Sequence, residues 1–262
     1  AITHAINKER CLLLSPTGSG KSLIIYSLVR YYESILPKDK KILIIVPTTG
    51  LVSQMYNDFK DYSSKNKWNV DNKCHVIYAG QDKVTEKKVV ISTWQSLYKM
   101  SEKYFSQYGA IFGDECHLFK SKSLTTLMTK LKDCKYRIGT TGTLDGTHTH
   151  KLVVEGLFGG VHNVTTTTKL MEKDLLSKLE IDCINLQYPM KDIESIKRAT
   201  YQDEIKWIIT HEKRNEFITS LCSSMKGNTL LLFNFVEHHG KPLFNRIRSE
   251  CGDRKVFFIH GG

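Results

Sequence analysis

The sequence lacks any run that approaches the ~20 consecutive apolar residues of a membrane-spanning helix. It also lacks a charged start followed by an apolar run, which is the pattern of a signal peptide. Its seven cysteines are scattered, with no CxxC pair and an odd total, so neither a disulfide framework nor a zinc site is indicated. These absences predict a soluble, intracellular protein without a membrane partner.

The 262 residues have an ordinary globular composition, with 40% hydrophobic and 25% charged residues, which excludes a disordered chain. The net charge of +11 is uneven. Residues 1–160 contain 23 Lys and Arg against 14 Asp and Glu, whereas residues 161–262 contain 15 against 13. Such a basic excess favours a polyanionic partner, although a lysine-rich surface that only maintains solubility explains the charge equally well.

Short apolar runs alternate with helix-like segments in the first part of the chain. The run at 42–46 is apolar on both faces, which is typical of a parallel sheet covered by helices on both sides. The expected strands are 11–14, 42–46, 76–78, 89–91, 110–112 and 136–138, and the expected helices are 21–35, 51–62, 94–100 and 124–131. This α/β domain is predicted to end near residue 160.

Residues 161–262 are expected to form a second unit. About 100 residues are too few for a complete copy of the first domain, so the second one is predicted to be incomplete. The expected strands are 181–186, 229–235 and 256–259, and the expected helices are 201–225 and 242–249.

The strongest local signal is the segment SPTGSGKS at residues 15–22, between an expected strand and an expected helix. Glycines at 18 and 20 allow backbone N–H groups to surround a phosphate at a helix N-terminus. The predicted nucleotide contacts are Pro16, Thr17, Gly18, Ser19, Gly20, Lys21 and Ser22. Lys21 would reach the β and γ phosphates, and the Ser22 hydroxyl would ligate Mg²⁺. The pattern GxxxxGK[ST] fails at its first position, which is Ser15, and the alternative is a Gly-Ser turn that caps the helix.

The second signal is Asp114-Glu115-Cys116-His117, directly after the apolar run at 110–112. Hydrolysis of a nucleoside triphosphate needs one carboxylate to hold the metal and a second group to activate the attacking water. We expect Asp114 to hold Mg²⁺ and Glu115 to activate the water. Taken alone, an Asp-Glu pair at a strand end is usually a solvated turn.

Three further polar segments follow expected strands: 47–49, 92–95 and 141–143. The carboxyl ends of parallel strands form the edge at which α/β sheets bind ligands. Each segment alone is equally compatible with a polar loop that begins a helix.

In order and spacing, these segments resemble the motifs of superfamily 2 DExH-type helicases, and within them a phage branch of DNA recombination and repair helicases. Motif I corresponds to 15–22, motif Ia to 47–54, a strand-contacting motif to 92–97, motif II to 114–117 and motif III to 141–143. The resemblance implies a RecA-like, P-loop ATP-binding domain over 1–160 and the N-terminal part of a second RecA-like domain over 161–262. For a phage protein it also implies the host cytoplasm.

The resemblance further implies an ATP-dependent helicase or translocase that moves on nucleic acid, with DNA favoured over RNA. ATP and Mg²⁺ would be held by Lys21, Ser22, Asp114 and Glu115, with Lys21, Asp114 and Glu115 as catalytic residues. Coupling of hydrolysis to movement falls to His117, Thr141, Gly142 and Thr143, and contact with nucleic acid to Pro47, Thr48, Thr93 and Trp94. The alternatives are an RNA helicase, the motor subunit of a restriction system, and a non-catalytic nucleic-acid-binding module.

The family's glutamine motif before motif I, and its motifs V and VI with their arginines, are not found in the sequence. Loss of such an arginine lowers hydrolysis by roughly 10³ to 10⁵. Weak nucleotide binding and slow hydrolysis are therefore expected of residues 1–262 alone.

The histidines at 148, 150, 238 and 239 have no partners at metal-ligand spacing, so we expect them to be surface residues. Trp68, Trp94 and Trp207 are candidates for base stacking. Core packing is the favoured alternative for Trp207 because it lies in an expected helix.

Overall fold

The computed structural model describes residues 1–78, 80–144 and 148–260 and divides the chain into two compact units, Ala1–Leu179 and Glu180–Gly262. The sheet of the first unit includes residues 161–163, which pair with β1. The first unit therefore extends past residue 160, where the sequence pattern placed the domain boundary.

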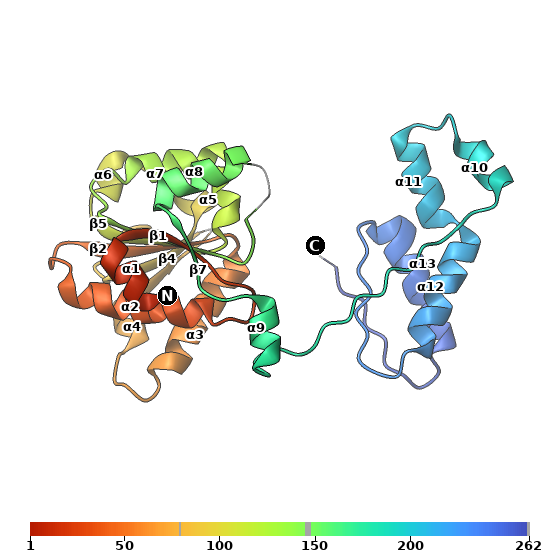
Figure 1. The fold of residues 1–262 in the computed structure, drawn as a ribbon, viewed down its shortest axis with the longest axis horizontal. Helices are drawn as coiled ribbons and strands as arrows, with labels where there is room; N and C mark the ends of the chain where they lie inside the picture. Colours follow the sequence, from red (N-terminus) through yellow and green to blue (C-terminus); the bar gives the residue numbers. More distant parts are fainter. Residues whose placement is uncertain (79, 145–147, 261–262) are drawn as a thin grey trace. The chain divides into compact units, whose positions relative to one another are not determined.

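The first unit is built on a seven-stranded sheet in which every strand pair is parallel (Figure 1). The strands are β1 (Arg10–Leu14), β2 (Lys41–Val46), β3 (Cys74–Ile77), β4 (Val89–Thr93), β5 (Tyr108–Gly113), β6 (Tyr136–Thr141) and β7 (Val161–Asn163). Their order is β3-β4-β2-β5-β6-β1-β7. All six strands predicted for this part are present, whereas β7 was not predicted.

Helices cover both faces of the sheet (Figure 1). One face packs against α1 (Ile2–Lys8), α2 (Lys21–Ile35), α3 (Thr49–Ser63) and α4 (Val70–Lys73). The other packs against α5 (Trp94–Leu97), α6 (Glu102–Phe105), the 3-10 helix η1 (Cys116–Lys120), α7 (Lys122–Lys130) and α8 (His148–Phe158). Alternate residues of β2 serve the two cores: Ile42, Ile44 and Val46 face the first, and Leu43 and Ile45 face the second. The predicted parallel sheet between two helical layers is confirmed.

The helix predicted at 94–100 ends earlier, at Leu97. The Lys130 ammonium donates hydrogen bonds to the carbonyls of Tyr98 and Met100, at 2.7 and 2.8 Å. Those carbonyls therefore serve a side chain rather than a continuing helix. After β7, the short helix α9 (Thr167–Glu172) completes the regular structure of the first unit.

The second unit contains α10 (Met190–Ile196), α11 (Tyr201–Thr210), α12 (Glu212–Ser224), the π-helix η2 (Val236–Gly240) and α13 (Lys241–Glu250). The single helix predicted at 201–225 is wrong, because two helices meet at His211. The backbone of His211 is extended, and its Nδ1 accepts a hydrogen bond from the Arg214 N–H at 3.4 Å. His211 thus caps a new helix.

The strands predicted at 181–186, 229–235 and 256–259 are not formed in the described part of the second unit. Segments 229–234 and 254–260 instead line a largely apolar cavity of about 770 Å³ beside α13. The rings of Phe233 and Phe258 stack there with their centroids 5.3 Å apart, so side-chain packing joins the two segments. Apolar sequence alone predicted strands here, but a strand also requires a partner to complete its hydrogen-bond ladder.

Two residues singled out in the sequence, a histidine expected at the surface and a tryptophan considered for base stacking, are buried. His239 is only 8% exposed and its Nε2 lies 3.2 Å from an Arg214 nitrogen, so the surface prediction is wrong for His239. Burial and the neighbouring guanidinium lower the pKa of this imidazole. Trp68 is also buried, with its indole N–H donating to Glu33 at 2.7 Å. The side chains at 148 and 150 lie outside the described part of the structure.

None of the described helices has both the length and the apolar character needed to cross a membrane.

Candidate functional site

The loop at 15–22 joins β1 to α2, as predicted. Gly18 and Gly20 have φ angles of 77° and 81°, in the left-handed region that favours glycine. Gly20 is also the N-cap of α2. A helix N-terminus presents unpaired backbone N–H groups and the positive end of the helix dipole, so the loop is suited to an anion such as phosphate.

Ser15, the residue that departs from the usual glycine of this motif, is fully buried. Its hydroxyl lies 2.6 Å from the Ser19 hydroxyl, and Ser19 Oγ also donates to the Pro16 carbonyl at 2.5 Å. The Ser15 backbone N–H donates to the Thr141 carbonyl at 2.9 Å. Ser15 therefore closes the loop on itself and fixes it to β6, and the departure from the motif does not disturb the loop.

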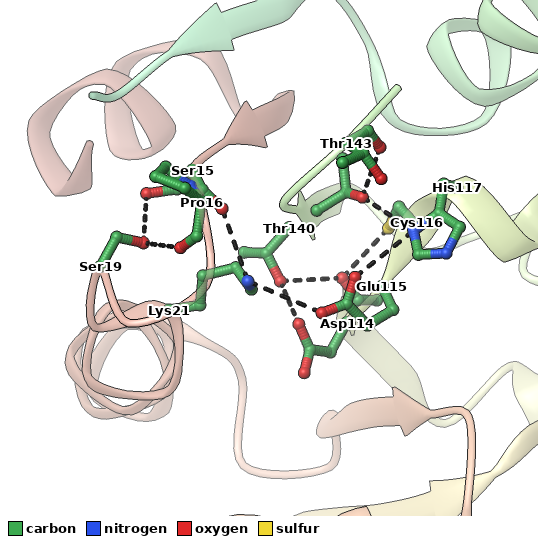
Figure 2. A network of polar contacts seen from close by, with 12 residues as sticks. Ser15, Pro16, Ser19, Lys21, Asp114, Glu115, Cys116, His117, Thr140 and Thr143 are labelled. Atoms are coloured by element: carbon green, nitrogen blue, oxygen red, sulfur yellow. Dashed lines mark hydrogen bonds and ion pairs between the residues drawn. The ribbon is translucent and has the colours of Figure 1, made fainter. Parts of the chain in front are cut away.

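Lys21 connects the loop to the acidic segment that follows β5. Its Nζ lies 3.4 Å from the Ser15 carbonyl oxygen and 3.6 Å from Glu115 Oε1 (Figure 2). The Lys21 side chain is only 12% exposed. The sequence separates Lys21 from Glu115 widely, and the parallel sheet brings them together at its carboxyl edge, as predicted.

Asp114 follows β5 and is fixed by two hydrogen bonds. Its N–H donates to the Ile45 carbonyl at 2.9 Å, and its Oδ1 accepts from the Thr140 hydroxyl at 2.8 Å. Burial of the carboxyl raises its pKa, and the nearby Glu115 carboxylate acts in the same direction, whereas the Thr140 hydrogen bond opposes the shift. A desolvated carboxylate of this kind gains stability from a bound cation.

Glu115 has a positive φ of 50°, which is rare for a residue with a side chain. Its carboxylate contacts Lys21 on one side and His117 Nδ1 on the other, the latter at 3.3 Å. His117 Nδ1 also lies 3.0 Å from the Thr141 hydroxyl, which donates to the Thr143 carbonyl at 2.8 Å (Figure 2). Of the four residues predicted to couple hydrolysis to movement, His117, Thr141 and Thr143 thus form one chain of polar contacts, and Gly142 lies between the last two in sequence.

A pocket of about 510 Å³ lies between these elements, within the range usual for small-molecule sites. Its walls come from the loop, from the acidic segment and from α3. The lining residues are Thr17, Gly18, Gly20, Lys21, Ser22, Leu51, Gln54, Met55, Asp58, Asp114 and Glu115. Seven of them were predicted from the sequence. Pro16 and Ser19 shape the loop but do not line the pocket.

Helix α3 contributes the four lining residues that sequence reasoning missed: Leu51, Gln54, Met55 and Asp58. Leu51 is three and four residues before Gln54 and Met55, and Asp58 is four and three residues after them, so the four share one face of α3. The same face reaches Tyr62, whose hydroxyl lies 2.8 Å from the Ser22 hydroxyl. The helical spacing was available in the sequence, but nothing in it indicated that this face turns toward the loop.

The predicted nucleic-acid contacts lie at the ends of β2 and β4. Thr48 is exposed and caps α3, its hydroxyl accepting from the Leu51 N–H at 3.3 Å. The Gln95 amide donates to the Pro47 carbonyl at 3.5 Å, which joins the two segments. Thr93 is buried with its hydroxyl 3.0 Å from Ser96 Oγ, and Trp94 is half-buried against the core.

Residues 1–146 match the family described as "Type III restriction enzyme, res subunit". The chain is 37% identical over 263 residues to "ATP-dependent DNA helicase uvsW" of Enterobacteria phage T4, covering 98% of this chain and 50% of the relative. A crystal structure of T4 UvsW is similar with a TM-score of 0.56 and 34% identity, covering 95% of this chain and 49% of that chain. The Hef helicase domain of Pyrococcus furiosus shares the fold, with a TM-score of 0.56 and 17% identity over 86% of this chain and 53% of that chain.

The chain spans about half the length of the T4 relative. The likeness to UvsW and Hef confirms the predicted RecA-like fold, and the T4 relative confirms the predicted resemblance to a phage helicase branch. The chain belongs to the family described as the res subunit of type III restriction enzymes and is a member of the superfamily 2 helicases.

Proposed function

We propose that the chain is the nucleotide-binding part of an ATP-dependent DNA helicase or translocase. One observation carries the proposal. A single pocket at the carboxyl edge of the sheet contains Lys21 and Ser22 from the loop together with Asp114 and Glu115 from the acidic segment. A cation, a hydroxyl and two carboxylates around one cavity are the groups that phosphoryl transfer to water requires.

ATP and Mg²⁺ are the proposed cofactors, and the groups in the pocket suit both. Mg²⁺ prefers hard oxygen ligands and usually takes one or two from the protein and the rest from phosphates and water. The Ser22 hydroxyl and the Asp114 carboxylate line the pocket and would hold it. No group of three or more His, Cys, Asp or Glu side chains suited to a metal occurs among the described residues.

The proposed roles follow from the contacts. Lys21 orients the phosphates, and the bound metal would neutralise charge on their oxygens. Glu115 orients the attacking water and accepts its proton, held in place by His117 at 3.3 Å. His117 in turn contacts Thr141 at 3.0 Å, so a shift of the segment 141–143 alters the position of Glu115. That chain of contacts is the proposed coupling between hydrolysis and movement.

DNA is the proposed polymeric partner. The T4 relative is described as a DNA helicase, and the basic excess of this chain lies in residues 1–160. The ends of β2 and β4, with Pro47, Thr48, Thr93 and Trp94, would contact the strand. We also propose that residues 161–262, or those from Glu180 onward, begin a second RecA-like domain, because the similarity to T4 UvsW covers 95% of the chain. An intracellular location, the host cytoplasm for a phage protein, is proposed on the same relative.

Replacing Lys21 by Ala tests the proposal. Loss of the phosphate-binding ammonium should weaken binding of a fluorescent ATP analogue at least tenfold, while affinity for single-stranded DNA at fixed salt stays the same. Lys38→Ala, which removes an exposed lysine outside the pocket, is the matched control and should change neither. Equal loss of nucleotide and DNA binding in Lys21→Ala would contradict separate sites.

The family description favours a second candidate, the motor subunit of a restriction system. The two candidates differ in their products, because a helicase separates the strands of a forked duplex and a translocating restriction motor leaves them paired. ATP-dependent release of one strand from forked DNA supports the helicase. Stimulation of hydrolysis by RNA but not by DNA would contradict both.

A further inference from the structure

A tyrosine outside all the helicase motifs contacts the residue proposed to ligate Mg²⁺. Tyr62 lies near the end of α3, and its hydroxyl is 2.8 Å from the Ser22 hydroxyl on α2. Forty residues separate the two in sequence. No other side-chain hydrogen bond is formed by either hydroxyl within the described part of the chain.

Tyr62 continues the face of α3 that forms one wall of the nucleotide pocket. Asp58 lines the pocket one helical turn earlier, and residues four apart on a helix lie on the same face. The contact with Ser22 is therefore made from one helical turn beyond the last α3 residue that lines the pocket.

The position of the Tyr62 side chain is fixed by its surroundings. Its ring packs against the ring of Tyr26 with centroids 5.5 Å apart. The Asn66 amide donates to the Tyr26 hydroxyl at 2.8 Å and to the Tyr62 carbonyl at 3.2 Å. Because ring and backbone are both held, the Tyr62 hydroxyl is placed before any ligand arrives.

We propose that Tyr62 is a positioning residue for the metal, acting through Ser22. A serine hydroxyl has one proton and two lone pairs. If Ser22 donates its proton to the Tyr62 oxygen, its lone pairs remain free for a cation in the pocket. Such outer partners fix the orientation of metal-binding groups in other proteins. The inference rests on the proposed magnesium site at Ser22.

Tyr62→Phe removes the hydroxyl and keeps the ring against Tyr26. We expect the Mg²⁺ concentration that half-saturates binding of the fluorescent nucleotide mant-ADP to rise about two- to tenfold, the effect of one hydrogen bond. Affinity for mant-ADP in excess EDTA should stay unchanged, because the hydroxyl acts on the metal and not on the phosphates. A merely structural role would weaken binding in EDTA as well.

Tyr56→Phe is the matched control, since Tyr56 lies on the same helix and bonds Asp71 instead. It should leave the Mg²⁺ dependence unchanged.

Ser22→Ala separates the proposed role of Tyr62 from the proposed magnesium site. A raised Mg²⁺ requirement in Ser22→Ala but not in Tyr62→Phe overturns the role of Tyr62 and leaves the magnesium site intact. No change in Ser22→Ala overturns the magnesium site itself. An equal fall in mant-ADP affinity with and without EDTA in Tyr62→Phe also overturns the positioning role.

Discussion

The hydroxyls of Ser15 and Ser19, inside the nucleotide loop, are predicted to contribute unequally to the free energy of unfolding. Ser15 is fully buried, and its only side-chain hydrogen bond within the described chain is to Ser19, at 2.6 Å. Ser19 has a second bond, to the Pro16 carbonyl at 2.5 Å. Removing Ser15 Oγ leaves Ser19 with a partner, whereas removing Ser19 Oγ leaves a buried hydroxyl with none.

The magnitudes follow from that difference. Ser15→Ala loses one hydrogen bond, which costs about 1 kcal/mol. Ser19→Ala loses two and strands the Ser15 hydroxyl, which costs about 2 to 3 kcal/mol. The double substitution removes the stranded group as well, so its cost should fall short of the sum of the single costs by about 1 kcal/mol or more. For a unit of this size each kcal/mol lowers Tm by about 2 to 4 °C.

Thermal unfolding of the three variants, followed by calorimetry, measures these differences. The expected order of Tm is wild type, then Ser15→Ala, then the double variant, with Ser19→Ala lowest or equal to the double. A Ser19→Ala variant as stable as Ser15→Ala, or costs that simply add, would refute the argument.

Nucleotide binding by Ser15→Gly, which restores the usual motif residue, should match that of the wild type, because the Ser15 side chain does not line the pocket.

Three other substitutions test the site from different directions. Asp114→Asn should raise Tm at neutral pH: the buried carboxyl has a raised pKa, so it favours the fold while protonated and loses that contribution as pH rises. The gain should shrink as the pH falls through the raised pKa of the folded carboxyl and vanish below about pH 4, where the unfolded carboxyl is protonated too, and a gain independent of pH would contradict the stated cause. Gly139→Ala places a methyl 2.7 Å from both Cys116 Sγ and Leu12 Cδ1 and should cost about 1 to 3 kcal/mol, measured by denaturant unfolding. Adding Cys116→Ala should restore the part of that loss that comes from the sulfur, and no recovery would exclude the contact with Cys116 as its source. His117→Ala should preserve nucleotide affinity and lower the stimulation of hydrolysis by DNA, whereas unchanged stimulation would exclude His117 from coupling.

Much of the first unit was predictable because the sequence pattern of its strands is clear. The run at 42–46 is apolar at every position, as a strand covered on both faces requires, and each polar segment follows such a run. Since parallel strands end at one edge, the meeting of Lys21 with Glu115 followed from topology alone.

The contribution of α3 was not predictable on the same grounds. Its sequence shows an ordinary amphipathic helix, and burial of Val52 and Phe59 fixes only the face turned to the sheet. The contact between Tyr62 and Ser22 depends on how α3 packs on α2. That is a tertiary property with no local signal.

The strand predictions for the second unit were wrong for the opposite reason. The apolar sequence pattern of a strand was present, but no neighbouring strand completes a hydrogen-bond ladder with it in the described part of the unit. The segments at 229–235 and 256–259 have the apolar character of strands, yet Leu232 and Ile259 are 80% and 85% exposed. Hydrophobic pattern selects a strand only where a ladder and a second layer are available.

The turn after β5 combines two features that oppose folding. Glu115 adopts a left-handed backbone, at a cost of order 1 to 2 kcal/mol for a residue with a Cβ, and Asp114 places a carboxyl where burial disfavours its charge. Strained backbone and desolvated charge persist only where the surroundings enforce them. The next residue, Cys116, is fully buried, and its side chain fits because positions 113 and 139 are glycines, where a Cβ would lie within 2.8 Å of its sulfur. The glycines at 113 and 139, inside β5 and β6, therefore make room for the residue that follows the two carboxylates, so a side chain at either position is expected to disturb the turn that carries them.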